Sequence, residues 1–332
     1  EVNSPGEPGV MYLVGVGFAA SATPASASPV LQDMRARAQS RNREMISRLN
    51  AYLDPVTITL ESDVTPLTPA GNATERHVLV AYDTAARRCF AARSDLVAFW
   101  ADRLGMPAGD VDALLGDVPY PHDAFRSRLM KRGSVGYVQP GPNTFPSLDT
   151  VVGAIATCGA IPTYPYLDGT SAAETQLGEL LELLIAHGIG GITVIPDRNW
   201  NIRNADEKAL KLDNLARAMA LAEQLDLPVL AGTEMNKPGQ RELDDFASAE
   251  LLPFWPVFQR GAAWLWGHTV MARRFGCGDQ SEWARGWLPA RRDRNAFFVE
   301  LGQALRPSDE RLDSLAELLV DGPRAVRAAL AH

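Results

Sequence analysis

Residues 227–240, LPVLAGTEMNKPGQ, hold the pattern that decides the fold. A proline opens a short apolar run, which is typical of a buried parallel strand, and a glycine ends it. The polar residues Thr233, Glu234 and Asn236 follow at the carboxyl end of this strand. Because α/β proteins carry their catalytic and ligand-binding residues at that end, we expect a site here.

Helical and strand patterns alternate three times from residue 147 onward. The three pairs are 148–158 with 160–163, 174–187 with 191–195, and 213–225 with 228–231. Strands separated by helices predict right-handed crossovers and a parallel sheet, either open or closed into a barrel. Each strand ends in polar or aromatic residues that we expect at one edge of the sheet. They are Tyr164, Tyr166 and Asp168 after the first strand, Asp197, Arg198 and Asn199 after the second, and Glu234 and Asn236 after the third.

Two further strands are predicted outside these three units. The apolar run 10–18 predicts a buried strand that contains Tyr12, and residues 262–266 predict another just before His268. This second strand places His268 at the same edge as the other tips, as a candidate metal ligand. The alternative is a histidine that is hydrogen-bonded within the core.

The segment between the first strand and residue 147 has a different sequence pattern. An amphipathic, arginine-rich helix is predicted over 29–52, and short helical segments broken by proline and glycine follow. We therefore expect an α/β unit built from residues 1–53 and 147–332, with its sheet either open or closed into a barrel, interrupted by a helical insertion or cap over 54–146.

Composition limits the function classes. The chain has 332 residues, 46% of them hydrophobic, and a net charge of −8, which argues against nucleic-acid partners beyond short oligonucleotides. Its three cysteines have no metal-ligand spacing and suit a reducing, cytoplasmic compartment. No apolar run is long enough to cross a membrane, so we expect no membrane partner. The sequence begins at Glu1 without an initiator methionine, so we expect either a fragment of a longer protein or a processed product.

Several segments, in this order, carry a resemblance to a known family. They are Glu1 with 12–15 (YLVG), the helix through Arg37 and Arg41, 74–77 (TERH), 158–165 (CGAIPTYP), 189–194 (IGGITV) and 232–236 (GTEMN). In order and spacing they resemble the polymerase and histidinol phosphatase (PHP) superfamily, in the branch with a helical insertion that includes nucleotide phosphatases and RNA-degrading phosphoesterases. The resemblance implies a distorted seven-stranded β/α barrel with two or three metal ions at its carboxyl end.

The chain departs from this family at the positions of the metal ligands. Tyr12, Tyr164 and Asn236 stand where the family has histidines, Glu234 stands where it has an aspartate, and the His-x-His of the family would precede Glu1. A phenol or a carboxamide oxygen binds divalent transition metals more weakly than imidazole does.

Two functional hypotheses follow. In the first, Glu1, Glu234, Asn236 and His268 help to hold a divalent Mn, Zn, Fe or Mg ion that activates water to hydrolyse a small phosphate ester of nucleotide or oligonucleotide type. The substrate phosphate would bind to Arg37, Arg41, Arg76 and His77, although a solvated helix face is the alternative for these residues. In the second, no metal binds, and the barrel is a binding module for a small molecule or a phosphate. Its pocket uses Tyr12, Tyr164, Glu234 and Asn236 as hydrogen-bonding groups, with Asp197 and Arg198 as further candidate lining residues.

Overall fold

The computed structural model describes residues 1–332 except 1, 5, 121, 236–240, 307–310, 331 and 332. The described chain separates into two compact units, of which the first comprises residues 1–30 and 147–332 and the second residues 31–146. Each unit has its own hydrophobic core.

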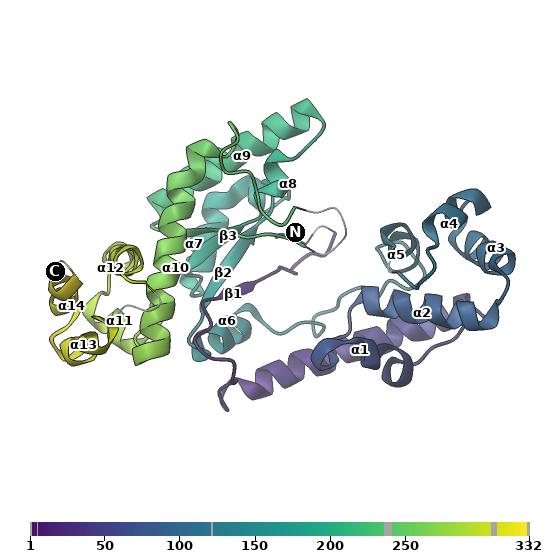
Figure 1. The fold of residues 1–332 in the computed structure, drawn as a ribbon, viewed down its shortest axis with the longest axis horizontal. Helices are drawn as coiled ribbons and strands as arrows, with labels where there is room; N and C mark the ends of the chain where they lie inside the picture. The colour runs from purple at the N-terminus through teal and green to yellow at the C-terminus, as the bar shows by residue number, and fades with distance from the viewer. Residues whose placement is uncertain (1, 5, 121, 236–240, 307–310, 331–332) are drawn as a thin grey trace. The chain divides into compact units, whose positions relative to one another are not determined.

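A four-stranded sheet forms the centre of the first unit (Figure 1). Its strands lie in the order β1 (Val14–Val16), β2 (Ile161–Tyr166), β3 (Gly191–Val194) and β4 (Val229–Ala231). Strands β2, β3 and β4 pair in parallel, with Tyr164 opposite Ile192 and Ile192 opposite Val229. The three predicted helix-and-strand units and their parallel pairing are therefore confirmed, and the class is mixed α/β.

Strand β1 differs from the prediction in length and in direction. It covers three residues of the predicted 10–18 run and pairs antiparallel with β2, so the sheet is not parallel throughout. Gly17 adopts a positive φ of 71° and turns the chain directly after the strand. Before the strand, the Asn3 side chain bonds to Tyr12 N and to Pro165 O, at 2.7 and 3.0 Å, and so substitutes for further ladder bonds.

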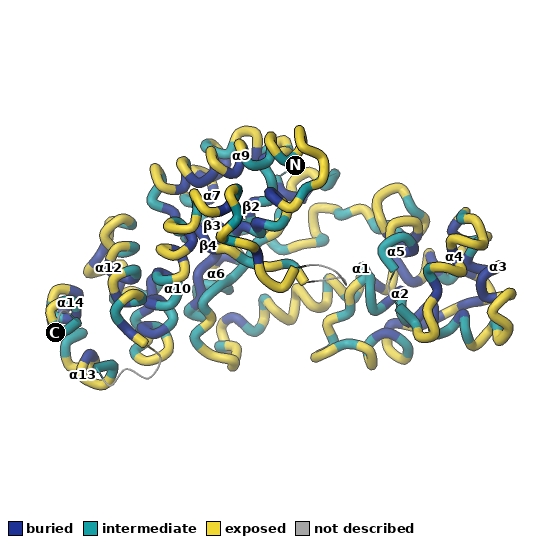
Figure 2. The backbone as a smooth tube through the Cα atoms, turned by 45° about the horizontal axis from the view of Figure 1, so that its top comes forward, coloured by how far each residue is buried: buried dark blue, intermediate teal, exposed yellow. Residues whose placement is uncertain are grey.

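Two apolar layers cover the sheet, because alternate strand residues point to opposite faces. Tyr164, Ile192 and Val229 belong to one core cluster together with residues of α7 and α9, whereas Ile161 and Leu230 belong to another together with residues of α10 and α12. Buried positions gather along the strands and along the helices that pack on them (Figure 2). The helices of this unit are α6 (Leu148–Thr157), α7 (Leu177–Ala186), α8 (Asp197–Trp200), α9 (Ala205–Gln224), α10 (Trp255–Phe275), α11 (Glu282–Trp287), α12 (Arg291–Ala304), α13 (Arg311–Leu318) and α14 (Pro323–Leu330).

The predicted strand over 262–266 is wrong, because these residues lie inside the continuous helix α10. Their buried neighbours Gly261, Trp264, His268 and Met271 recur every three or four residues, which is the period of a helix face. Glycines allow this helix to approach its neighbours closely. A Cβ atom on Gly261 would lie 1.9 Å from Val229 O of β4, and one on Gly267 would lie 2.0 Å from Phe298 O of α12.

The described part of the second unit contains helices and no strand. They are α1 (Ser28–Tyr52), α2 (Glu75–Cys89), α3 (Arg93–Leu104), α4 (Ala108–Leu114) and α5 (Asp123–Leu129), with one π-helical turn at Leu60–Val64 and two 3-10 turns at Thr65–Leu67 and Pro69–Gly71. This unit begins at Leu31 and not at residue 54, because Ile46 and Leu49 of α1 share a core with Leu79 of α2 and Trp100 of α3.

None of the described helices is both long enough and apolar enough to cross a bilayer.

Candidate functional site

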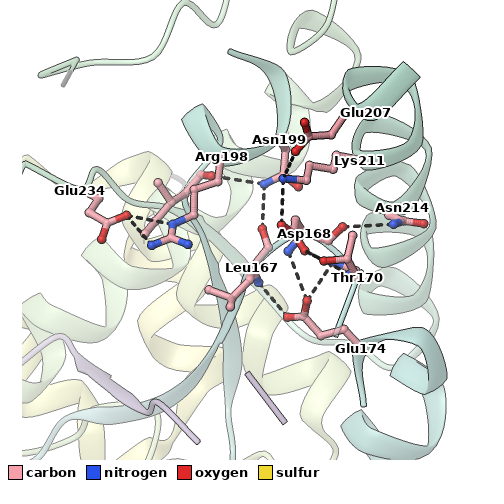
Figure 3. Close-up of polar contacts among 12 residues, drawn as sticks. Leu167, Asp168, Thr170, Glu174, Arg198, Asn199, Glu207, Lys211, Asn214 and Glu234 are labelled. Atoms are coloured by element: carbon pink, nitrogen blue, oxygen red, sulfur yellow. Dashed lines mark hydrogen bonds and ion pairs between the residues drawn. The ribbon is translucent and has the colours of Figure 1, made fainter. Parts of the chain in front are cut away.

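The carboxyl ends of β2, β3 and β4 carry a network of polar side chains (Figure 3). Strand β2 leads into the loop 167–170, β3 leads into helix α8, and β4 leads into residues 232–235. The sequence predicts Tyr164, Asp197, Arg198 and Glu234 at this edge of the sheet. In the structure each of them lies in one of these strands or shortly after it.

A buried carboxylate closes the loop that follows β2. Glu174 is 4% exposed, and its two oxygens accept hydrogen bonds from the backbone N–H groups of residues 167, 168 and 169, at 2.8, 3.2 and 2.8 Å. Tyr164 is fully buried and its hydroxyl donates to the same carboxylate at 3.0 Å. Three convergent backbone N–H groups typically bind an anion. Here the side chain of Glu174 occupies that position.

The next part of the network is an ion cluster between this loop and α9. Lys211 Nζ lies 3.1 Å from Asp168 Oδ2 and 2.9 Å from Glu207 Oε1, and its side chain is 16% exposed. Burial alone would raise the pKa of Asp168, but hydrogen bonds from Thr170 and Lys211 outweigh it and hold that pKa below its ordinary value. Burial alone would lower the pKa of Lys211, whereas its two carboxylate partners raise it.

Arg198 and Glu234 join the ends of β3 and β4. Arg198 Nε and Nη2 lie 2.8 and 2.7 Å from Glu234 Oε2, and the side chains are 42% and 26% exposed. Next to them, Asn199 is fully buried and donates to the carbonyl oxygens of Leu167 and Ile195. Asp197 accepts a hydrogen bond from Asn201 at 2.9 Å. The exposed part of this edge is therefore an arginine–glutamate pair and not an open cluster of carboxylates.

The described residues at this edge do not fit a metal ion. No group of three histidine, cysteine, aspartate or glutamate side chains converges anywhere in the described ranges. Asp168, Glu174 and Glu234 direct their oxygens at Lys211, at backbone N–H groups and at Arg198. The predicted ligands Glu1 and Asn236 lie outside the described residues.

His268 lies at the opposite edge of the sheet, next to the turn after β1. Its Nδ1 accepts from Asp279 N at 2.9 Å, so Nε2 carries the proton and donates to Gly17 O at 3.0 Å. Burial lowers the pKa of His268, although Gly17 and Asp279 oppose this effect. Both ring nitrogens are thus engaged, and the structure does not bring His268 to Glu234. Tyr12 is 59% exposed and contributes its backbone to the bonds with Asn3.

The four predicted phosphate-binding residues all belong to the second unit, in two places. Arg37 and Arg41, one turn apart on α1, line a cavity of about 400 Å³ whose other wall is the segment 138–144. Arg76 instead forms an ion pair with Asp123 at 3.2 Å, and His77 Nδ1 accepts from Thr74 N at the start of α2. The structure therefore brings Arg37 and Arg41 together and leaves Arg76 and His77 elsewhere in the unit.

Comparison with known proteins adds little to this geometry. No protein-family profile and no curated protein matches the chain. Similar solved structures include an amidohydrolase from Chromobacterium violaceum with bound sulfate and no metal, at 18% identity and a TM-score of 0.40 over 76% of this chain and 72% of that one. A proposed metal-dependent phosphoesterase from Bifidobacterium adolescentis matches at 22% identity and a TM-score of 0.38, over 68% of this chain and 65% of that one. At such scores the likeness assigns neither a family nor an activity to this chain.

Proposed function

We propose that this protein binds a small phosphorylated molecule through the cavity of Arg37 and Arg41, and that it does so without a metal ion. One observation carries the proposal: the guanidinium of Arg41 lines this cavity and forms no ion pair with any described carboxylate. At about 400 Å³, the cavity is within the range that small-molecule sites occupy.

The neighbours of Arg41 fit a phosphate group. Ser40 and Thr144 bring hydroxyl groups to the lining, and Gln139 brings a carboxamide. An arginine fork matches two phosphate oxygens, and hydroxyl and amide donors can satisfy the others. The ring of Phe145, 5.7 Å from the guanidinium carbon of Arg41, supports the arginine by a cation–π contact.

The other charged residues of the cavity are already neutralised. Arg37 pairs with Asp33 at 2.7 Å and also donates to Asn143 O, and Glu44 pairs with Arg48. Arg37 therefore fixes the wall formed by residue 143, whereas Arg41 supplies the unpaired positive charge. A phosphate group bound here would neutralise this charge.

The carboxyl edge of the sheet supports a binding role in the same way. A metal-dependent hydrolase needs open carboxylate or imidazole ligands, whereas the carboxylates described here are occupied by cations and by backbone donors. These occupied carboxylates favour a binding role over metal-dependent hydrolysis.

Titration of the whole chain with inorganic phosphate tests the proposal. Arg41→Gln should weaken phosphate binding about 10- to 100-fold, the usual effect of losing a charge-assisted hydrogen bond. Arg43→Gln is the matched control, because Arg43 lies on the same helix but pairs with Glu61 at 2.8 Å outside the cavity. Equal phosphate affinities for both variants and the unaltered protein would remove this cavity from the account.

Metal-dependent hydrolysis of nucleotide-type phosphate esters, on a seven-stranded PHP barrel, is the alternative. It rests on the sequence resemblance and on the position of Glu234 at a strand end, and it requires ligands such as Glu1 and Asn236. Elemental analysis of the purified chain and a phosphatase assay with added manganese test it. Bound divalent metal together with turnover that Glu234→Gln abolishes would favour this alternative over the binding role.

A further inference from the structure

A second cavity lies at the amino edge of the sheet in the first unit, on the side opposite the candidate site. It measures about 300 Å³ and is bounded by the turn 188–190 before β3, by α11 and by the start of α12. Its charged lining residues are Arg285, Arg291 and Arg294, and no acidic side chain of the described residues lines it. The charge of this lining is therefore opposite in sign to the net charge of the chain, which is −8.

Within the described part of the chain, a single buried carboxylate, that of Asp279, forms an ion pair with one of these three guanidinium groups. Arg294, 13% exposed, approaches Asp279 Oδ2 at 3.4 Å, and Asp279 is itself 3% exposed. The geometry of this approach is too poor for a hydrogen bond, so Arg294 Nε and Asp279 Oδ2 are buried without one. Arg285 and Arg291 form no ion pair within the described ranges of the chain.

Carbonyl oxygens hold the arginines in place without neutralising them. Arg291 donates to Leu225 O at 2.8 Å, and Arg294 donates to Leu288 O at 2.9 Å. Burial and the nearby charge of Arg294 lower the pKa of Arg291, and Asp226 and Asp279 offset this only in part. Positive charge in the cavity therefore exceeds negative charge, and the arginine side chains are fixed in advance of any ligand.

We infer that this cavity is a second anion site, which binds the phosphate group of a small molecule between Arg291, Arg294 and Arg285. Gln280 and Asn295 add carboxamide groups to the same lining. A bound dianion would relieve the repulsion between Arg291 and Arg294 and would use guanidinium N–H groups that the carbonyl contacts leave over. The shared chemistry is the phosphate group, either of free phosphate or of a phosphate monoester.

Calorimetric titration of the whole chain in the Arg41→Gln background tests this second site apart from the first. Inorganic phosphate should still bind to that variant with one site per chain. Adding Arg291→Gln should weaken the remaining binding about tenfold or more, as expected when a charge-assisted hydrogen bond is lost.

Two further variants keep the result interpretable. Arg292→Gln is the matched control, since Arg292 is the next residue but pairs with Asp226 at 3.0 Å outside the cavity, and it should leave the affinity unchanged. Arg285→Gln changes an exposed arginine of the same lining, so it should weaken phosphate binding even if Arg291→Gln fails to fold.

Glycerol phosphate, titrated in parallel, distinguishes the two sources of the phosphate group. Tighter binding of the ester than of inorganic phosphate would assign the site to a phosphorylated metabolite, and the reverse would assign it to free phosphate. Absence of residual phosphate binding in the Arg41→Gln background, or equal binding by the Arg291→Gln and Arg292→Gln variants, would overturn the second site. Neither result bears on the proposal for Arg41, which this titration would contradict if Arg41→Gln itself bound phosphate at both sites as the unaltered protein does.

Discussion

Glu174 accepts four hydrogen bonds at the end of β2, three of them from consecutive backbone N–H groups. The sequence predicts Tyr164 at this strand end but gives no sign of its partner, because a contact ten residues along depends on how the intervening loop closes. The Asp168–Gly169 pair does indicate a turn. In the structure Gly169 has a positive φ of 77° and brings the backbone close to Asn214.

Lys211 is also not among the predicted site residues, although its spacing from Glu207 is that of a helical ion pair. Replacing it with methionine leaves Asp168 partly buried without its cation. We expect Lys211→Met to lower the free energy of unfolding on the order of 1–2 kcal/mol near neutral pH. Arg217→Met is the control, because Arg217 is 73% exposed on the same helix, and it should change stability by less than about 0.5 kcal/mol.

The pH dependence of the Lys211 effect has a definite sign. The lowered pKa of Asp168 means that its contribution is present above the ordinary aspartate pKa and disappears as pH falls through the lowered value. The raised pKa of Lys211 means that its contribution is present below the ordinary lysine pKa and disappears as pH rises through the raised value. Denaturant unfolding across pH should therefore show that the free energy of unfolding of the unaltered protein exceeds that of Lys211→Met by a constant amount between these two limits. Outside them the difference should decrease. A difference that is constant down to strongly acidic pH would contradict the ion-pair origin.

Among the elements, α10 shows how sequence patterns mislead. Its segment 261–272 has a short run of apolar residues that also fits a strand, and helix and strand patterns cannot be distinguished over so few residues. The glycines decide the packing instead. Close approach of α10 to β4 and to α12 requires Gly261 and Gly267 to lack a Cβ atom.

Replacing Gly267 with alanine tests this packing. The added methyl group would overlap Phe298 O of α12, so we expect Gly267→Ala to lose about 3 kcal/mol of stability, although alanine is the better helix former. Gly153→Ala in α6 is the matched control, because no atom lies within 4 Å of its added Cβ, and it should gain up to about 1 kcal/mol. Thermal unfolding of both variants measures the contrast. Similar gains in both would mean that α10 and α12 do not pack as described.

At the scale of the whole molecule, the sequence predicts the alternation of helices and parallel strands because that pattern is local and repeated. It does not predict the antiparallel β1, whose pairing depends on a partner almost 150 residues away, with Val14 opposite Thr163. It also assigns α1 to the barrel, since amphipathic periodicity shows that a face is buried but not against which core. Of the predicted site, Arg198 and Glu234 meet at the carboxyl edge and Arg37 and Arg41 meet in the second unit.

The proposed function of the whole chain is to bind a phosphate group without a metal ion. Titration of the whole chain with a phosphate monoester, in EDTA and then with added manganese, tests it most directly. We predict the same affinity for the ester in both solutions and no release of inorganic phosphate. In each solution Arg41→Gln should lower this affinity about 10- to 100-fold, as expected when a charge-assisted hydrogen bond is lost. Binding that disappears in EDTA and returns with manganese, accompanied by hydrolysis of the ester, would contradict the claim.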